Sequence, residues 1–128
     1  HHLMRDALPR LLEAGASLLH ERARNAPESL TPRDLSLASE AGDQVAGAVL
    51  RLAGERLGVA IASAANLLDI TTFVVGGGIA NAGAPLFNGM RDAARERVLA
   101  VHRDALRILP AEYGNDAGML GAAALFLD

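Results

Sequence analysis

Apolar residues recur along this chain at two spacings, which divide it into a helical first part and a mixed second part. A helical spacing predicts a helix over 4–24, a short helix from Thr31 to about residue 42, and a long helix from Asp43 to about Leu68. Thr31 and Asp43 are residue types that cap helix starts, and Pro32 suits a first helical position. The stretch 25–29, "NAPES", predicts a loop.

The second half of the long helix, "LGVAIASAANLL" at 57–68, is apolar on nearly every side. A helix of this kind is buried on more than one face, and its alanine and glycine residues let another backbone approach closely.

The second part alternates between strand and helix. "ITTFVV" at 70–75 predicts a strand, a helix follows over 85–101, a short strand lies within 105–113, and a last helix covers 115–128. Strand, helix and strand in this order imply two parallel strands with a right-handed crossover. Two strands are too few for a stable sheet. We therefore expect an α/β fold, mostly helical with two parallel strands, whose sheet is incomplete in this chain.

Three consecutive glycines, Gly76, Gly77 and Gly78, follow the first predicted strand. They do not match the dinucleotide fingerprint, because Asn81 stands where its third glycine belongs, and the lysine of a phosphate-binding P-loop is absent. Two interpretations stay open. The glycines either form a turn that needs positive φ, or allow a ligand to lie against bare backbone at the carboxyl end of a parallel strand.

Composition narrows the class of protein. The chain has 128 residues, 51% of them hydrophobic, and a net charge of -3, which predicts one folded domain with no direct nucleic-acid contact. The absence of cysteine excludes disulfides and thiolate metal sites within this chain. No apolar run reaches membrane-spanning length and nothing resembles a signal peptide, so the expected location is the cytoplasm. Residues 1–3 read as an expression-tag remnant, 4–42 as N-terminal helices and 43–128 as the main unit.

The sequence offers no catalytic constellation. His20 and His102 stand among charged residues on predicted helices, which favours solvated surface positions. Acidic residues are dispersed, and no serine has the surroundings of a nucleophile. The segment "GNDAGMLGAA" at 114–123 is typical of a capped helix that packs closely against a neighbour. We predict neither catalytic residues nor a metal site.

From about Ala38 to Asp128 the chain resembles the C-terminal part of the ROK family of repressors, uncharacterised reading frames and sugar kinases. The resemblance rests on Gly42-Asp43 with Ala46 and on three further stretches, namely "LGVAIASAANLLD", "FVVGGGIANAG" and "GNDAGMLGAAALF". One departure is Ile70, where the family usually has proline.

This resemblance implies an actin-like, ribonuclease-H-like fold with two lobes around a nucleotide cleft. Carried onto this sequence, it places Gly76, Gly77, Gly78 and Ile79 at the adenosine-binding edge, with ATP and Mg²⁺ used by the full-length kinase and neither held tightly by this chain. The family's phosphate loop, catalytic aspartate, sugar-contacting residues and cysteine zinc cluster all precede the matching stretch.

Two functions follow from the resemblance. The chain is expected to be a C-terminal fragment of a glucokinase-like sugar kinase, inactive alone, whose partners are the missing N-terminal part, a second copy, sugar and ATP. The alternative is the sugar-sensing and dimerisation part of a ROK transcriptional repressor, because the glycine run and the closing motif occur in both classes.

Overall fold

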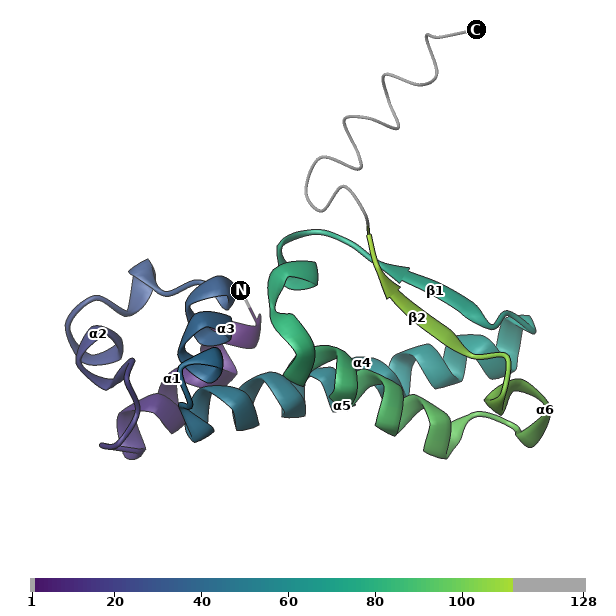
Figure 1. Ribbon diagram of the computed structural model, residues 1–128, viewed down its shortest axis with the longest axis horizontal. Helices are drawn as coiled ribbons and strands as arrows, with labels where there is room; N and C mark the ends of the chain where they lie inside the picture. The colour runs from purple at the N-terminus through teal and green to yellow at the C-terminus, as the bar shows by residue number, and fades with distance from the viewer. Residues whose placement is uncertain (1, 112–128) are drawn as a thin grey trace, which may run out of the picture.

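The computed structural model describes residues 2–111. One long helix runs through the structure, with a group of short helices at its N-terminal end and a group that contains two strands along the rest (Figure 1). The helical group holds α1 (His2–Glu13), α2 (His20–Asn25), the 3-10 turn η1 (Pro27–Ser29) and α3 (Pro32–Glu40), and leads into the long helix α4 (Gln44–Leu68). The second group holds β1 (Thr72–Val75), the 3-10 turn η2 (Gly78–Asn81), α5 (Gly83–Arg97), α6 (Ala100–Arg103) and β2 (Arg107–Pro110). The helix predicted over 115–128 lies outside the described residues.

Both predicted helix caps are confirmed. The Thr31 hydroxyl accepts from the Asp34 amide at 3.3 Å, while the Asp34 carboxylate accepts from the Thr31 amide at 2.8 Å. This reciprocal arrangement is a capping box, with Pro32 at the first helical position. Asp43 Oδ1 accepts from the amides of Val45 and Ala46 at the start of α4.

The prediction of one helix over 4–24 is wrong. α1 ends at Glu13, and a turn leads to α2, which begins at His20. The Ser17 hydroxyl and the Leu18 amide both donate to Asp43 Oδ2, at 2.7 and 2.8 Å. The chain is not helical at Ser17 and Leu18 because these residues donate hydrogen bonds to the capping residue of α4. Helical periodicity is a local pattern and cannot reveal a contact between residues 25 or 26 positions apart.

The helix predicted over 85–101 is also divided. α5 begins two residues earlier, at Gly83, and ends at Arg97, after which Val98 is extended and the short α6 follows. The amide of Leu99 donates to the Asn66 side chain, whose own amide group donates to the Arg97 carbonyl. Asn66 thus fixes the exit of α5 against the end of α4.

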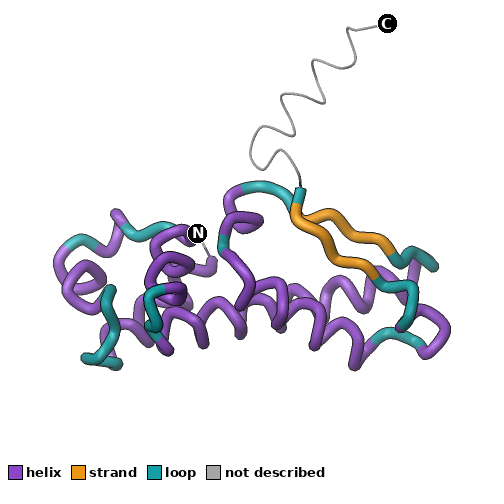
Figure 2. The backbone as a smooth tube through the Cα atoms, in the orientation of Figure 1, coloured by secondary structure: helices purple, strands orange, loops and turns teal. Residues whose placement is uncertain are grey.

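α4 and α5 lie side by side beneath the strands and form the closest helix pair of the described residues (Figure 2). Their contact is made through glycine: a Cβ built on Gly58 would lie 2.4 Å from the Met90 carbonyl oxygen. Leu50, Leu86 and Met90 are fully buried at this helix pair. Backbone contact of this kind explains the glycines within α4 and α5, where helix propensity alone disfavours them.

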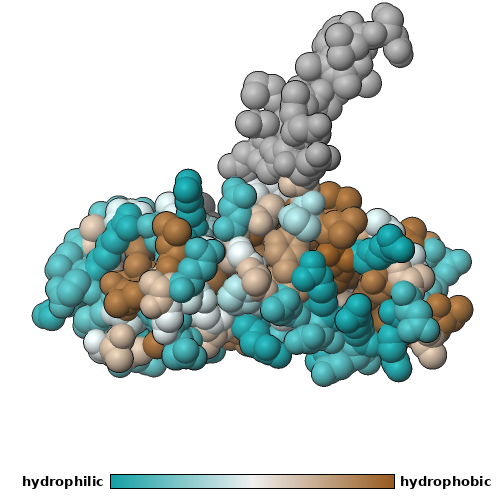
Figure 3. Space-filling model, in the orientation of Figure 1, coloured by the Kyte–Doolittle hydropathy of each residue, from teal (hydrophilic) through white to brown (hydrophobic). Residues whose placement is uncertain are grey.

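The two parallel strands are confirmed. β1 and β2 pair in parallel, with Thr72 opposite Arg107 and Val75 opposite Pro110. Ile108 is buried beneath them, whereas Val74 and Leu109 are 65% and 45% exposed on the other face. Figure 3 shows the apolar surface that gathers over these strands. A parallel sheet is usually covered on both faces, and the described residues cover only one.

The C-terminal half of α4 also has apolar side chains that the described residues leave exposed. Burial on more than one face was predicted for 57–68, but Val59, Leu67 and Leu68 are exposed. Among the described residues the predicted burial is therefore partial: Leu57 and Ile61 pack against the core, while the face of Val59 and Leu67 stays exposed.

The two edges of the sheet differ. The amides of Arg107 and Ala111 donate to carbonyls of the β1 segment, so the backbone of Ile108, by alternation, faces the outer edge of β2. There Arg91 Nη2 donates to the Ile108 carbonyl at 3.1 Å, and Pro110 has no N–H to offer. No described side chain or loop bonds the outer edge of β1. Among described residues, the sheet is blocked at β2 and open at β1.

Candidate functional site

The glycine run connects β1 to η2 at the carboxyl end of the strand. Gly76, Gly77 and Gly78 are all exposed. Gly77 has φ 77° and ψ -172°, a conformation that favours glycine because a Cβ would be strained there. Gly76 and Gly78 have no positive φ. The turn interpretation therefore explains Gly77 and leaves its two neighbours without a conformational reason.

The space around the glycines is open on the side a side chain would occupy. A Cβ built on Gly77 or Gly78 would meet nothing within 4 Å, and one on Gly76 would make an ordinary 3.5 Å contact with the Ala111 Cβ. Neither backbone torsion nor crowding within the described chain requires glycine at position 78. Among the described residues, the backbone at position 78 is therefore open to the approach of another molecule.

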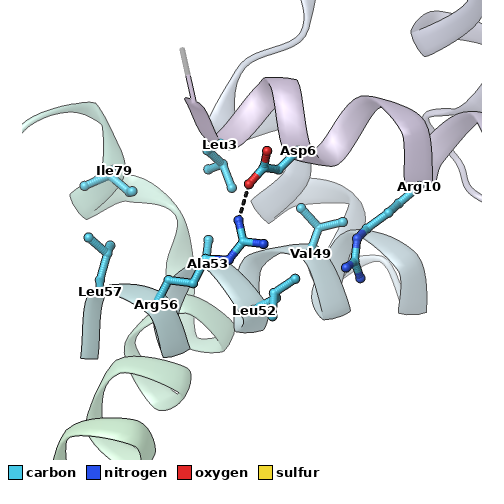
Figure 4. Close-up of a pocket in the computed structure, with 9 residues that line it drawn as sticks. All are labelled: Leu3, Asp6, Arg10, Val49, Leu52, Ala53, Arg56, Leu57 and Ile79. Atoms are coloured by element: carbon cyan, nitrogen blue, oxygen red, sulfur yellow. Dashed lines mark hydrogen bonds and ion pairs between the residues drawn. The ribbon is translucent and has the colours of Figure 1, made fainter. Parts of the chain in front are cut away.

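Ile79 links the glycine run to an apolar hollow of about 190 Å³ between α1, α4 and η2 (Figure 4). An ion pair between Asp6 and Arg56 joins α1 to α4 and forms part of its lining. The other side chains around the hollow are chiefly aliphatic: Leu3, Arg10, Val49, Leu52, Ala53 and Leu57. A flat apolar group would find in this hollow the contacts that small-molecule pockets usually provide.

The loop after the glycines is held in place by short contacts. The amides of Ala80 and Ala82 donate to the carbonyls of Gly77 and Ile79, both at 3.0 Å. Gly83 has φ 78°, and a Cβ there would lie 2.6 Å from the Ser36 hydroxyl of α3. The glycine run is thus set on a fixed support, which suits a binding surface.

Ionisable groups near the helix starts have explicable pKa values. Burial raises the pKa of Asp43, but the hydrogen bonds from Ser17, Ala46, Leu18 and Val45 outweigh burial and bring that pKa below its ordinary value. The pKa of Asp34 is likewise lowered, because bonds from Thr31 and Arg22 exceed the effect of burial. Both carboxylates stabilise the fold and neither belongs to the glycine run.

The prediction that His102 is solvated is wrong. Its side chain is buried, and Nε2 lies 3.6 Å from Asp69 Oδ1 at the end of α4. The chain after α5 folds back against α4, which charged neighbours in the sequence do not reveal. His20 is half-buried, with Nδ1 3.0 Å from the Leu11 carbonyl. His102 precedes β2 while the glycines follow β1, so in a parallel pair they lie at opposite ends.

Two kinds of feature are absent from residues 2–111. Within that range no group of three or more histidine, aspartate or glutamate side chains could hold a metal ion. None of the helices it contains has the length and apolar character needed to cross a membrane.

The predicted site residues Gly76, Gly77, Gly78 and Ile79 lie together in one loop. Sequence reasoning missed the adjoining hollow, because Leu3 and Val49, which line it, are distant from that loop in the sequence.

Comparison with known proteins gives one family. The sequence model of the ROK family matches residues 11–128. Glucokinase of Halalkalibacterium halodurans is 34% identical over 96 residues, which cover 75% of this chain and 29% of that protein.

Two solved structures share the fold. A ROK family glucokinase from Streptomyces griseus, in complex with glucose and AMPPNP, superposes with a TM-score of 0.80 at 29% identity, over 96% of this chain and 40% of that one. A ROK family transcriptional regulator, a homologue of the E. coli MLC protein, superposes with a TM-score of 0.78 at 29% identity, over 94% of this chain and 29% of that one. The chain spans well under half the length of each of these proteins.

Proposed function

Because the chain belongs to the ROK family, we propose that it is the C-terminal part of a glucokinase-like sugar kinase and supplies the adenosine-binding edge of its ATP site. In this proposal residues 43–128 belong to an actin-like, ribonuclease-H-like lobe, with 4–42 as helices that pack against it. The observation that supports the proposal is Gly78, where neither its backbone torsion nor crowding by residues 2–111 calls for glycine.

The glycine loop suits the nucleoside end of ATP. Bare backbone at Gly76, Gly77 and Gly78 lets a flat base and ribose approach without a side chain in the way. The aliphatic hollow beside Ile79 offers contacts to an apolar ring. The position at the carboxyl end of a parallel strand is where ligands bind in open α/β sheets.

The chemistry belongs elsewhere in the full-length protein. Phosphoryl transfer to a sugar hydroxyl needs a base that accepts the proton and cations that balance the charge of the γ-phosphate, which Mg²⁺ supplies when bound. No described side chain near the glycine loop is placed to act as that base, since the adjoining Asp6 is engaged with Arg56. We propose that this chain alone binds ATP weakly and has no kinase activity.

The rest of the protein would cover the surfaces left open here. The unblocked edge of β1, the exposed pair Val74 and Leu109, and the exposed Leu67 of α4 would receive strands and helices of the N-terminal part. A second copy would cover further apolar surface, so we propose a homo-oligomer that works in the cytoplasm without direct nucleic-acid contact by this segment.

The second candidate is a ROK transcriptional repressor. It is favoured by one observation, the TM-score of 0.78 with a ROK transcriptional regulator, close to the value for the glucokinase. In that protein class the same lobe would respond to a sugar and mediate dimerisation, and other segments would bind DNA.

The complete reading frame that encodes this chain distinguishes the two. Its product, assayed with glucose and ATP, should form glucose 6-phosphate and ADP, and the chain of 128 residues alone should not. A product with a helix-turn-helix segment, sequence-specific DNA binding and no turnover would replace the kinase with the repressor. Turnover by the isolated chain would contradict the proposal that the catalytic parts lie elsewhere.

A further inference from the structure

We propose a second binding site, for the phosphate group of a small molecule, at the outer edge of β2. It is formed by Arg91, Arg95 and Arg107 together with the backbone amide of Ile108. These residues line a hollow of about 200 Å³ between α5 and β2, with Leu106 and Leu109 beside them. This site goes beyond the proposed nucleotide site.

The backbone contributes a donor of its own. Because the amides of Arg107 and Ala111 point toward β1, the amide of Ile108 points away from it, toward the outer edge. Its carbonyl accepts from Arg91 at that edge, while its N–H is left facing the hollow. Arg91, Arg95, Arg107 and the Ile108 backbone therefore border the same hollow, and cationic side chains with an N–H donor match the oxygens of a phosphate group.

One of the three arginines is already fixed in place. Arg91 Nη2 bonds the Ile108 carbonyl at 3.1 Å, and its guanidinium carbon lies 5.5 Å from the centre of the Phe87 ring. Both contacts hold the group without neutralising its charge. An anion binding there loses less side-chain entropy than one that must order a free arginine.

Other arginines of the same helix pair show the contrast. Elsewhere on α4 and α5, Arg51 pairs with Glu55 and Asp92, and Arg97 pairs with Glu96. None of the carboxylates in residues 2–111 pairs with Arg91, Arg95 or Arg107. Like charges that border one hollow without a counter-charge repel one another, and a bound anion relieves this repulsion.

The site can be tested by titrating the 128-residue chain with inorganic phosphate and, separately, with glucose 6-phosphate. The chemical shift of the Ile108 amide in ¹H–¹⁵N spectra reports binding. Saturable shifts are expected, and the tighter of the two titrations identifies free phosphate or a phosphate ester as the ligand. Arg95→Gln and Arg107→Gln should each weaken binding by about tenfold, the loss expected for one charge-assisted hydrogen bond.

Arg103→Gln is the matched control, because it removes the same charge from an exposed position on α6 outside the hollow. It should leave the affinity unchanged. Shifts that sodium chloride reproduces, equal weakening by Arg103→Gln, or unaltered affinity in both hollow variants would overturn the proposal. The readout does not involve the glycine loop, so these results are independent of the nucleotide site.

Discussion

Gly54 of α4 and Leu86 of α5 lie so close that a Cβ built on Gly54 would stand 2.0 Å from the Leu86 carbonyl oxygen. The contact is reciprocal, since a Cβ on Gly89 of α5 would stand 2.4 Å from the Arg51 carbonyl oxygen of α4. Two helix backbones at this distance leave no room for a methyl group. The glycines thus set the separation of the helices that support the sheet and its glycine loop.

Replacing Gly54 by alanine should therefore force α4 and α5 apart. We expect Gly54→Ala to lower the free energy of unfolding by about 2 kcal/mol, even though alanine favours helix, because the clash is with backbone that cannot turn away. Urea unfolding followed by circular dichroism measures this change. Gly15→Ala, in a turn where a Cβ meets nothing within 4 Å, is the control and should change stability by less than about 0.5 kcal/mol.

Asp43 should make the fold sensitive to acid. Its pKa is below the ordinary value of 3.8 in the folded state, so its stabilising contribution is complete above that value and is lost as the pH falls through the folded-state pKa. Asp43→Asn should therefore be less stable than the unaltered chain at pH 7, and the difference should shrink below about pH 4. A difference that stays constant down to pH 2.5 would contradict a role for the ionised carboxylate.

Asn66 should hold the exit of α5. Its side chain accepts from the Leu99 amide at 2.9 Å and donates to the Arg97 carbonyl at 3.1 Å. We expect Asn66→Ala to cost about 1–2 kcal/mol in thermal or urea unfolding, because two hydrogen bonds are lost. Ser63→Ala, one turn earlier on an exposed position of the same helix, removes only a bond to the Val59 carbonyl and should have a smaller effect.

The exposed apolar pair on the sheet should promote self-association of this chain. Val74 and Leu109 are paired neighbours on the outer face, so the double substitution Val74→Thr with Leu109→Gln should shift sedimentation toward the monomer. Val101→Thr, 77% exposed on α6, is the control and should leave association unchanged. Equal association in all three proteins would show that the sheet face takes no part.

Local patterns in the sequence identified the elements whose causes are local. Thr31, Pro32 and Asp43 marked helix starts because a cap involves residues within one turn. The β-branched and aromatic run at 70–75 marked a strand, and the order of elements predicted that the strands are parallel. The glycine loop was located correctly for the same reason, since it directly follows that strand.

What sequence reasoning missed depends on contacts between distant segments. The break after Glu13 exists because Ser17 and Leu18 bond Asp43. His102 is buried because the segment after α5 returns to the end of α4. The hollow beside Ile79 joins α1, α4 and η2, and no spacing along the chain brings these elements together.

The proposed role of Gly78 in nucleotide binding is tested most directly by the affinity of the full-length protein for AMPPNP. Calorimetry would compare Gly78→Val with the unaltered protein. Gly78 has open space and no positive φ, so valine should fold normally there and differ only where a ligand approaches. A substitution at Gly77 would be less informative, because its φ of 77° means that a side chain would strain the backbone as well as obstruct a ligand. We expect Gly78→Val to weaken AMPPNP binding at least about tenfold with unchanged thermal stability and glucose affinity. An unchanged AMPPNP affinity in a stably folded Gly78→Val protein would contradict the adenosine-binding role of the glycine loop.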